Sequence, residues 1–178
     1  MEVEDIHTLV FCFDENKFRG SDDLNPEGMT MCGNNHFSFK NGDLWQQDAG
    51  QSHNTFYGIQ YPSEIEVVAN AEIGKIKTAL TVSSESNIVP TKATINTTYP
   101  RSQTTEIGSS FFKNREGIFY VPVLRDLNTP GSSTVKHLTG DRIRAPFTFI
   151  KVQFNTTDKL QLRFINFGYK LSSGHEFV

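Results

Sequence analysis

Cysteine is scarce in this sequence, and so are the patterns that would make it a metal ligand. The 178 residues contain two cysteines, Cys12 and Cys32, without a CxxC pair or a Cys/His spacing typical of zinc. Two interpretations stay open for them. One is a disulfide between neighbouring strands; the other, favoured by the apolar settings FCF and MCG, is two buried free thiols.

Long hydrophobic runs and a strong net charge are also missing. No segment approaches the roughly 20 apolar residues of a membrane helix, so we expect no membrane segment. The net charge is −3 and the isoelectric point about 5.9, which gives no field that would attract nucleic acid. Acidic residues lean toward the start of the chain. The basic ones are scattered, with a local run at residues 141–144 that we interpret as solvated surface.

Catalytic motifs are absent as well. The sequence has no GxSxG motif and no phosphate-binding glycine loop. Ser173, close to the end of the chain, matches no nucleophile motif. No two histidines lie at a metal-ligand spacing, and we interpret all of them as surface or strand residues: His7, His36, His53, His137 and His175. We therefore predict no catalytic, cofactor-binding or metal-binding residue, and a protein that is not an enzyme.

Two groups of side chains could serve catalysis or ligand binding, and each also has a simpler structural interpretation. Glu64 and Glu66 share one strand face about 7 Å apart, within the range of inverting glycosidases, but neighbouring carboxylates on strands are common by chance. Four aromatic residues could form a platform for a sugar, although aromatics beside a hairpin more often pack in a core: Trp45, Phe56, Tyr57 and Tyr61.

Aromatic residues are plentiful, and they come with strong turn signals. Fifteen phenylalanines and 37% hydrophobic residues supply a core. The stretch FSFKNGDLW predicts a hairpin that turns at Asn41-Gly42, because both turn positions need a positive φ. The turn also predicts the register, in which these residues face each other: Lys40 and Asp43, Phe39 and Leu44, Ser38 and Trp45.

Alternation of apolar residues predicts strands along most of the chain, and no segment shows helical spacing. A second hairpin is expected with its turn at residues 114–117, and Pro122, which lacks an N–H donor, predicts an edge strand. Residues 84–110 are expected to form a long loop with one strand inside it. The predicted strands are residues 6–13, 64–69, 75–83, 93–97, 143–154 and 159–171.

Within these strands, side-chain faces can also be predicted. Ile150, Val152 and Phe154 share a face, and a change of phase indicates a β-bulge near residues 164–166. In residues 75–83 the Lys75–Lys77 face is expected to be solvated.

The fold class predicted from these features is all-β with almost no helix. The architecture is expected to be an antiparallel β-sandwich-like fold, or a propeller blade attached to a β domain. Residues 1–48 are predicted to form an N-terminal β-hairpin or blade-like segment, and residues 49–178 an antiparallel β domain.

Several phrases in this order resemble a known family. They are GNNHFSFKNGDLW, NTFYGIQYPSEIEVVAN, KIKTALTVSSES and FFKNREGIFYVPVLRD, the last ending in the REGIFYVPVLRD phrase of residues 115–126. Together they resemble the C-terminal part of the stabilisation proteins, the tail nozzle or muzzle proteins of crAss-like bacteriophages. The resemblance spans roughly residues 8–126.

The resemblance implies a structural virion protein of a phage tail, made in the host cytoplasm and forming part of the DNA exit conduit. Its implied partners are copies of itself in a ring and neighbouring tail proteins, with passing contact to genomic DNA. The strand with Pro122 and residues 84–110 are the expected contact regions. The alternative is a glycan- or receptor-binding β module of a phage tail, for which the aromatics would have to line an exposed groove.

Overall fold

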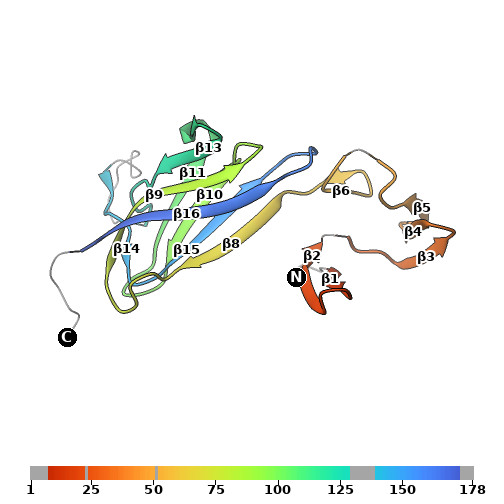
Figure 1. Ribbon diagram of the computed structural model, residues 1–178, viewed down its shortest axis with the longest axis horizontal. Coiled ribbons are helices and arrows are strands. Elements are labelled where there is room, and N and C mark those ends of the chain that lie inside the picture. The colour runs from red at the N-terminus through yellow and green to blue at the C-terminus, as the bar shows by residue number, and fades with distance from the viewer. Residues whose placement is uncertain (1–7, 23, 51, 129–138, 173–178) are drawn as a thin grey trace. The chain divides into compact units, whose positions relative to one another are not determined.

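The computed structural model describes residues 8–22, 24–50, 52–128 and 139–172, and it is all-β, as the sequence predicts (Figure 1). The chain divides into two compact units. Unit 1 comprises Met1–Tyr61 with Thr156–Lys159, and unit 2 comprises Pro62–Asn155 with Leu160–Val178. The predicted domain boundary between residues 48 and 49 stays a prediction. The division into compact units does not show which segment of the chain folds independently.

Unit 1 is built from three small antiparallel sheets. The first pairs β1 with β2, the second has the order β3-β4-β5, and the third pairs β6 with β7. Their bounds are Thr8–Cys12 (β1), Lys17–Asp22 (β2), Gly28–Cys32 (β3), Asn35–Lys40 (β4), Asp43–Gln46 (β5), Thr55–Phe56 (β6) and Ile59–Gln60 (β7).

The hairpin of β4 and β5 confirms the register predicted from its turn. Asn41 and Gly42 have φ angles of 54° and 83°, as a two-residue hairpin turn requires. Across the two strands, Lys40 pairs with Asp43, Phe39 with Leu44 and Ser38 with Trp45. The turn therefore fixes which side chains share the inner face of this sheet.

Both cysteines lie in unit 1, and both are free thiols, Cys12 half-buried and Cys32 exposed. The expectation that they are free is confirmed, and the expectation that they are buried is wrong. Cys32 ends β3 directly before Gly33, whose φ of 61° turns the chain, so its side chain lies at the tip of a hairpin and not inside a core.

The described residues of unit 2 form two antiparallel sheets. One has the order β11-β10-β15-β8; in the other, β12 pairs with β13 and β13 with β9, while β14 and β16 also pair with β9. Their bounds are Ser63–Ala69 (β8), Lys77–Ser86 (β9), Lys92–Thr97 (β10), Gln103–Gly108 (β11), Lys113–Arg115 (β12), Ile118–Pro122 (β13), Arg144–Ala145 (β14), Thr148–Phe154 (β15) and Leu162–Leu171 (β16). A 3-10 helix, Ser109–Phe111, follows β11.

The core of unit 2 lies between these two sheets, which makes the unit β-sandwich-like. Every second residue of β10 and β15 is buried, as expected for strands with one face toward a core. Ile150, Val152 and Phe154 lie on the buried face, which confirms their predicted grouping. They form one cluster with residues of both sheets: Ala79, Val82, Ile95, Ile107, Val121 and Ile143.

Residues 84–110 do not form the predicted long loop. They contain the end of β9 and the paired strands β10 and β11. Polar residues occupy buried positions of these strands and bond locally. Thr97 Oγ1 donates to the carbonyl of Arg101 at 3.1 Å and accepts the amide of Gln103 at 3.2 Å. A Ser/Thr-rich composition therefore hides strand alternation when β-branched threonine takes core positions.

Pro122 does not lie on an edge strand, because β13 is paired with both β12 and β9. The amide of Val123 donates to the carbonyl of Leu80 on the β9 side. Since successive amides of a strand point to opposite sides, the nitrogen of Pro122 points away from β9 and toward the side of β12. On that side the pairing of β13 with β12 ends at Tyr120, before Pro122 is reached. The missing donor thus costs the ladder no bond. The turn of this hairpin is Glu116-Gly117 (φ 52° and 85°), within the predicted residues 114–117.

Lys77 is the clearest correction inside β9. It was expected on a solvated face, but its side chain is 2% exposed. Its ammonium donates to the carbonyls of Lys75, at 3.1 Å, and Pro146. Burial lowers the pKa of Lys77 from its ordinary value, an effect that the charge of Glu72 opposes. The long apolar stem of a lysine can lie against the sheet while its ammonium reaches backbone carbonyls. The hydropathy of the sequence does not predict such contacts.

Irregularities in β16 lie on both sides of the predicted bulge. Its pairing with β9 shifts between Leu162 and Phe164 and again between Gly168 and Tyr169. At the second shift Gly168 lies opposite Thr81, and a Cβ added to Gly168 would overlap Thr81 Oγ1. The close approach explains why this position of the strand holds glycine.

Gly168→Ala is expected to lower the free energy of unfolding by about 1–3 kcal/mol, because the new methyl group overpacks against Thr81. In a Thr81→Ala background the same substitution should cost roughly half as much, since the obstructing hydroxyl is gone. Urea unfolding of the single and double variants measures both values. Gly108→Ala is the matched control, with φ −78° and no atom within 4 Å of the added Cβ. Equal costs in the two backgrounds would contradict this packing account.

Candidate functional site

The carboxylates Glu64 and Glu66 do not face a cleft. Both are exposed on β8, on the opposite face from Ile65 and Val67, which border the interior of unit 2. Glu64 accepts a hydrogen bond from Gln153 Nε2 at 2.8 Å and forms an ion pair with Lys151. The pair is thus part of a charged outer sheet surface, and the glycosidase interpretation gains no support from its surroundings.

The four aromatics of the predicted platform are half-buried and pack on one another. Trp45 and Tyr57 meet edge to face, with ring centroids 5.7 Å apart and planes at 84°. The hydroxyl of Tyr57 donates to Ser38 Oγ at 3.1 Å, and Ser38 is fully buried. Phe56 and Tyr61 are tilted at 49° with centroids 6.0 Å apart. These rings pack in two pairs, edge to face or tilted, and do not present a flat stacking surface.

The predicted absence of a metal site stays an expectation for the chain as a whole. Among the residues that the structure describes, no group of three or more His, Cys, Asp and Glu side chains could hold a metal ion. His36 and His53 are exposed, whereas His7, His137, His175 and Ser173 lie outside the described residues. No helix in the described part of the chain is long and apolar enough to cross a membrane.

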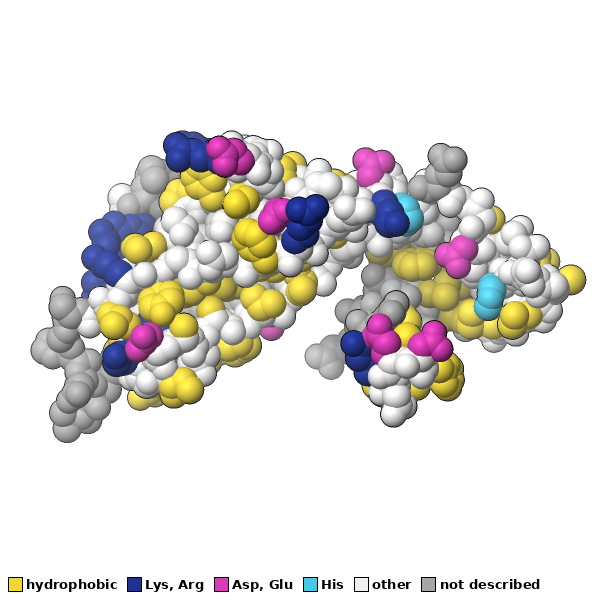
Figure 2. All heavy atoms as spheres, viewed as in Figure 1, with side chains coloured by type: hydrophobic (Ala, Val, Ile, Leu, Met, Phe, Trp, Pro, Cys, Tyr) yellow, Lys and Arg dark blue, Asp and Glu magenta, His cyan; other side chains and the backbone are white. Residues whose placement is uncertain are grey.

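An arginine-rich hollow of about 270 Å³ lies at one end of unit 2. Figure 2 shows Lys and Arg side chains gathered at the end of unit 2 where β14 lies. Arg142 and Arg144 are exposed, and Arg101 forms an ion pair with Asp141 at 3.0 Å. The hollow is lined by Arg101, Arg125, Gly140, Asp141, Arg142 and Arg144; we call it the arginine hollow.

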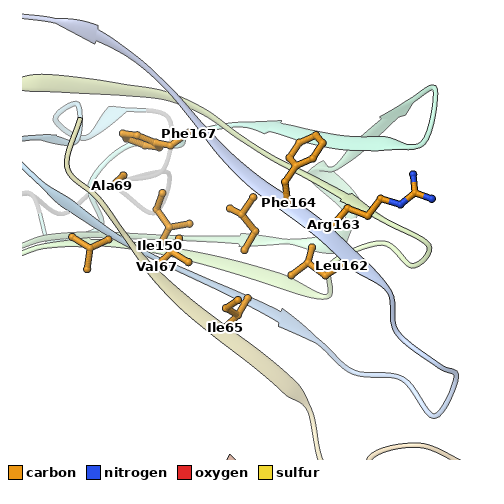
Figure 3. A pocket seen from close by; sticks show the side chains of 10 residues that line it. Ile65, Val67, Ala69, Ile150, Leu162, Arg163, Phe164 and Phe167 are labelled. Atoms are coloured by element: carbon orange, nitrogen blue, oxygen red, sulfur yellow. The ribbon is translucent and has the colours of Figure 1, made fainter. Parts of the chain in front are cut away.

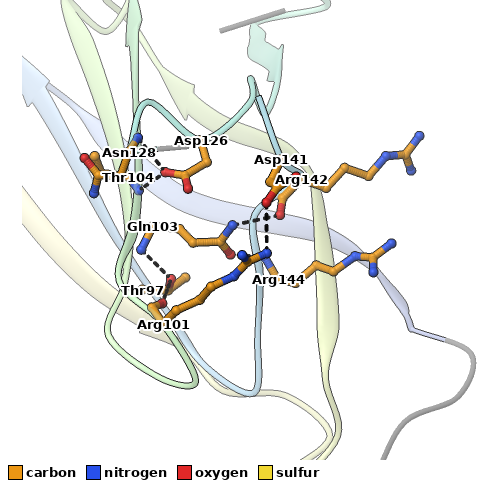
Figure 4. A network of polar contacts seen from close by, with 9 residues as sticks. All are labelled: Thr97, Arg101, Gln103, Thr104, Asp126, Asn128, Asp141, Arg142 and Arg144. Carbon is orange, nitrogen blue, oxygen red and sulfur yellow. Dashed lines mark hydrogen bonds and ion pairs between the residues drawn. The ribbon is translucent and has the colours of Figure 1, made fainter. Parts of the chain in front are cut away.

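A buried glutamine holds the backbone of this hollow (Figure 4). Gln103, which is 1% exposed, donates from Nε2 to the carbonyl of Arg142 at 3.0 Å. Its Oε1 accepts the amide of Arg144 at 2.8 Å. The two hydrogen bonds connect β11 to the segment that leads into β14. They use the nitrogen and the oxygen of the same side-chain amide.

Asp126 fixes a second side of the same region. Its buried carboxylate accepts the amides of Thr104 at 2.9 Å and Asn128 at 3.0 Å. Its own amide donates to the carbonyl of Asp141 at 2.9 Å. The chain segments that carry Arg125 and Asp141 are therefore bonded to each other as well as to β11.

Strand alternation directs the arginines outward. Ile143 and Ala145 are each 1% exposed, and the amide of Ala79 in β9 donates to the carbonyl of Ile143 at 3.0 Å. Because residues on either side of a buried strand position point the other way, Arg142 and Arg144 project together from the surface. The backbone that carries them is held by Gln103 on one side and by the pairing of β14 with β9 on the other.

An apolar groove of about 350 Å³ forms the other notable hollow of unit 2 (Figure 3). It lies between β8, which ends one sheet, and β16, which pairs with β9 in the other. Figure 3 shows Ile65 and Val67 of β8 opposite Leu162 and Phe167 of β16, with Ile150 at the base. The groove is the open side of the sandwich core.

Sequence reasoning missed the arginine hollow. Arg142 and Arg144 were interpreted as solvated surface, while Arg101 and Arg125 lie far from them along the chain. The fold alone brings them together. One signal was available in the sequence: acidic residues concentrate toward its start, which leaves the later part of the chain basic.

The comparisons with known proteins identify one family. Residues 51–126 match the Crassvirus muzzle protein C-terminal domain, which confirms the predicted resemblance over this range. The match extends from the FYG run through β8–β11 to Asp126, the carboxylate that holds the hollow. No curated protein matches the chain. This part of the chain is thus similar to a domain of a phage muzzle protein.

Gln103→Leu is expected to lower the free energy of unfolding of unit 2 by about 2–4 kcal/mol, because the carbonyl of Arg142 and the amide of Arg144 lose their buried partner. Gln161→Leu, an exposed glutamine of the same unit, is the matched control and should stay within about 0.5 kcal/mol of the wild type. Denaturant unfolding measures both. A Gln103→Leu variant as stable as the control would show that these two hydrogen bonds contribute nothing.

Proposed function

We propose, from the muzzle-domain match over residues 51–126, that this chain is a structural subunit of a phage tail. It forms part of the muzzle or nozzle through which DNA leaves the virion, and it does no chemistry. The family match carries the proposal. The all-β fold supports it, as do the exposed positions of Glu64 and Glu66 and the ion pair of Glu64 with Lys151.

In this proposal, copies of the chain assemble into a ring and contact neighbouring tail proteins. A closed ring built from head-to-tail contacts uses two different surfaces on every copy. The two contact regions expected from the sequence lie mostly within the sandwich: β10 and β11 are paired strands, and β13 lies between β12 and β9. The assembly surfaces are therefore proposed to be the loops and the charged surfaces of the units.

Genomic DNA is a passing neighbour in this function and not a ligand. The chain has a net charge of −3, so a wall of such subunits repels a DNA backbone weakly. Weak repulsion lets the duplex slide without a binding step. The virion is the proposed location, with synthesis in the host cytoplasm.

The alternative, a module that binds a glycan or receptor, receives less support. Such a module needs ring faces presented side by side to a sugar. Trp45 and Tyr57 instead meet edge to face, and the Tyr57 hydroxyl bonds the buried Ser38. The two rings therefore pack against residues of unit 1.

Antibody labelling of purified virions tests the proposal. An antibody raised against the purified chain and coupled to gold is expected to decorate the free end of the tail in electron micrographs, and peptides of the chain should copurify with the particles. Pre-absorbing the antibody with purified chain serves as the control and should remove the label. Particles that lack the chain, or label confined to the capsid, would contradict the proposed function.

A further inference from the structure

The two units carry opposite net charges. Residues 1–61 hold ten acidic and three basic side chains, a net charge of −7, whereas residues 62–178 hold ten acidic and fourteen basic ones, a net charge of +4. Asp158 and Lys159, which belong to unit 1, cancel each other. A modest total charge thus conceals an acidic unit and a basic unit within one chain.

The basic charge of unit 2 includes a built surface, the arginine hollow. Four arginines and one aspartate line it, and Asp141 offsets one of the four through its ion pair with Arg101. The backbone of Arg142 and Arg144 is fixed by the buried Gln103 and by the pairing of β14 with β9. Guanidinium groups can bind carboxylates through two bonds each, and the fixed backbone holds both side chains on the same surface.

Acidic side chains of unit 1 are exposed on more than one of its sheets. Asp14 follows β1, Asp43 begins β5 and Asp48 follows β5, and all three are exposed. They are carboxylates on short strands and turns, within reach of an approaching basic surface. Unit 1 therefore offers the charge that the arginine hollow lacks.

We infer that the arginine hollow of one copy binds the acidic unit 1 of a second copy. This inference rests on the proposed function, because it supplies the two different surfaces that a ring of identical subunits needs. The complementary charges also disfavour contacts between like surfaces, since hollow against hollow and unit 1 against unit 1 both repel.

A protein partner explains the hollow better than DNA does. Asp141 lies within the hollow and would repel phosphates, and a duplex drawn to the arginines would approach a chain whose other unit carries a charge of −7. The same acidic unit on a second copy is attracted to the hollow. Charge complementarity within the chain thus points to self-association.

Mixing two complementary variants tests the inference. Arg142→Gln with Arg144→Gln disables the hollow while leaving the backbone atoms that Gln103 binds. Asp14→Asn, Asp43→Asn and Asp48→Asn together neutralise part of unit 1; asparagine also tolerates the φ of 56° at Asp48. Sedimentation velocity of the full chain should show self-association about tenfold weaker for each variant alone, and for the wild type at high salt. An equimolar mixture should form one-to-one complexes, because one intact interface is restored between different chains.

Lys113→Gln with Arg115→Gln is the matched control. It removes the same charge from exposed positions of β12, and it should self-associate like the wild type. Circular dichroism should show that every variant keeps its folded spectrum.

Three results would overturn the inference: a wild-type chain that stays monomeric at low salt, association that neither variant weakens, or a mixture that behaves like its separate components. Binding of a labelled DNA duplex that only the arginine variant loses, with self-association unchanged, would assign the hollow to DNA. None of these results changes the expected labelling of the virion, so the inference can fail while the proposed function stands.

Discussion

Burial of alternate side chains between the two sheets of unit 2 is the interaction on which the rest of the structure depends. Ile95, Ile150 and Val152 of one sheet meet Val82 and Val121 of the other, each about 1% exposed or less. Removing such side chains from water supplies most of the favourable free energy of a fold of this size. The same alternation buries Ile143 and turns Arg142 and Arg144 outward, so that the core also determines which side chains the surface displays.

Much of this fold could be predicted from the sequence, where one local rule decides the outcome. Asn41-Gly42 determines a hairpin register, and the period-two pattern of residues 148–154 determines a buried face. The prediction failed where tertiary contacts override local pattern. The strand at residues 93–97 was predicted and is β10, but the threonines of β11 indicated a loop, because their burial depends on their partner strands. Lys77 indicated solvent, because one of the carbonyls that receive its ammonium belongs to Pro146, which is distant in the sequence. The arginine hollow was beyond prediction for the same reason, since β10, β11 and β14 must first assemble.

The function that we propose is one of assembly. A domain match to a phage muzzle protein, the pairing of Glu64 with Gln153 and Lys151, and aromatic rings that pack edge to face all agree with a subunit whose surfaces contact its neighbours. Exposed ion pairs are individually weak, usually below about 1 kcal/mol. In a ring each copy takes part in two such contacts, and no copy can leave a closed ring without breaking both. Individually weak ion pairs can therefore hold the assembly together.

The molar mass of the purified chain in solution, measured by light scattering across concentration and salt, tests the central claim most directly. The account predicts a mass that rises with concentration toward a fixed multiple of 20.1 kDa and falls back when salt is added. A mass of one chain at every concentration and at low salt would contradict self-assembly through complementary charged surfaces.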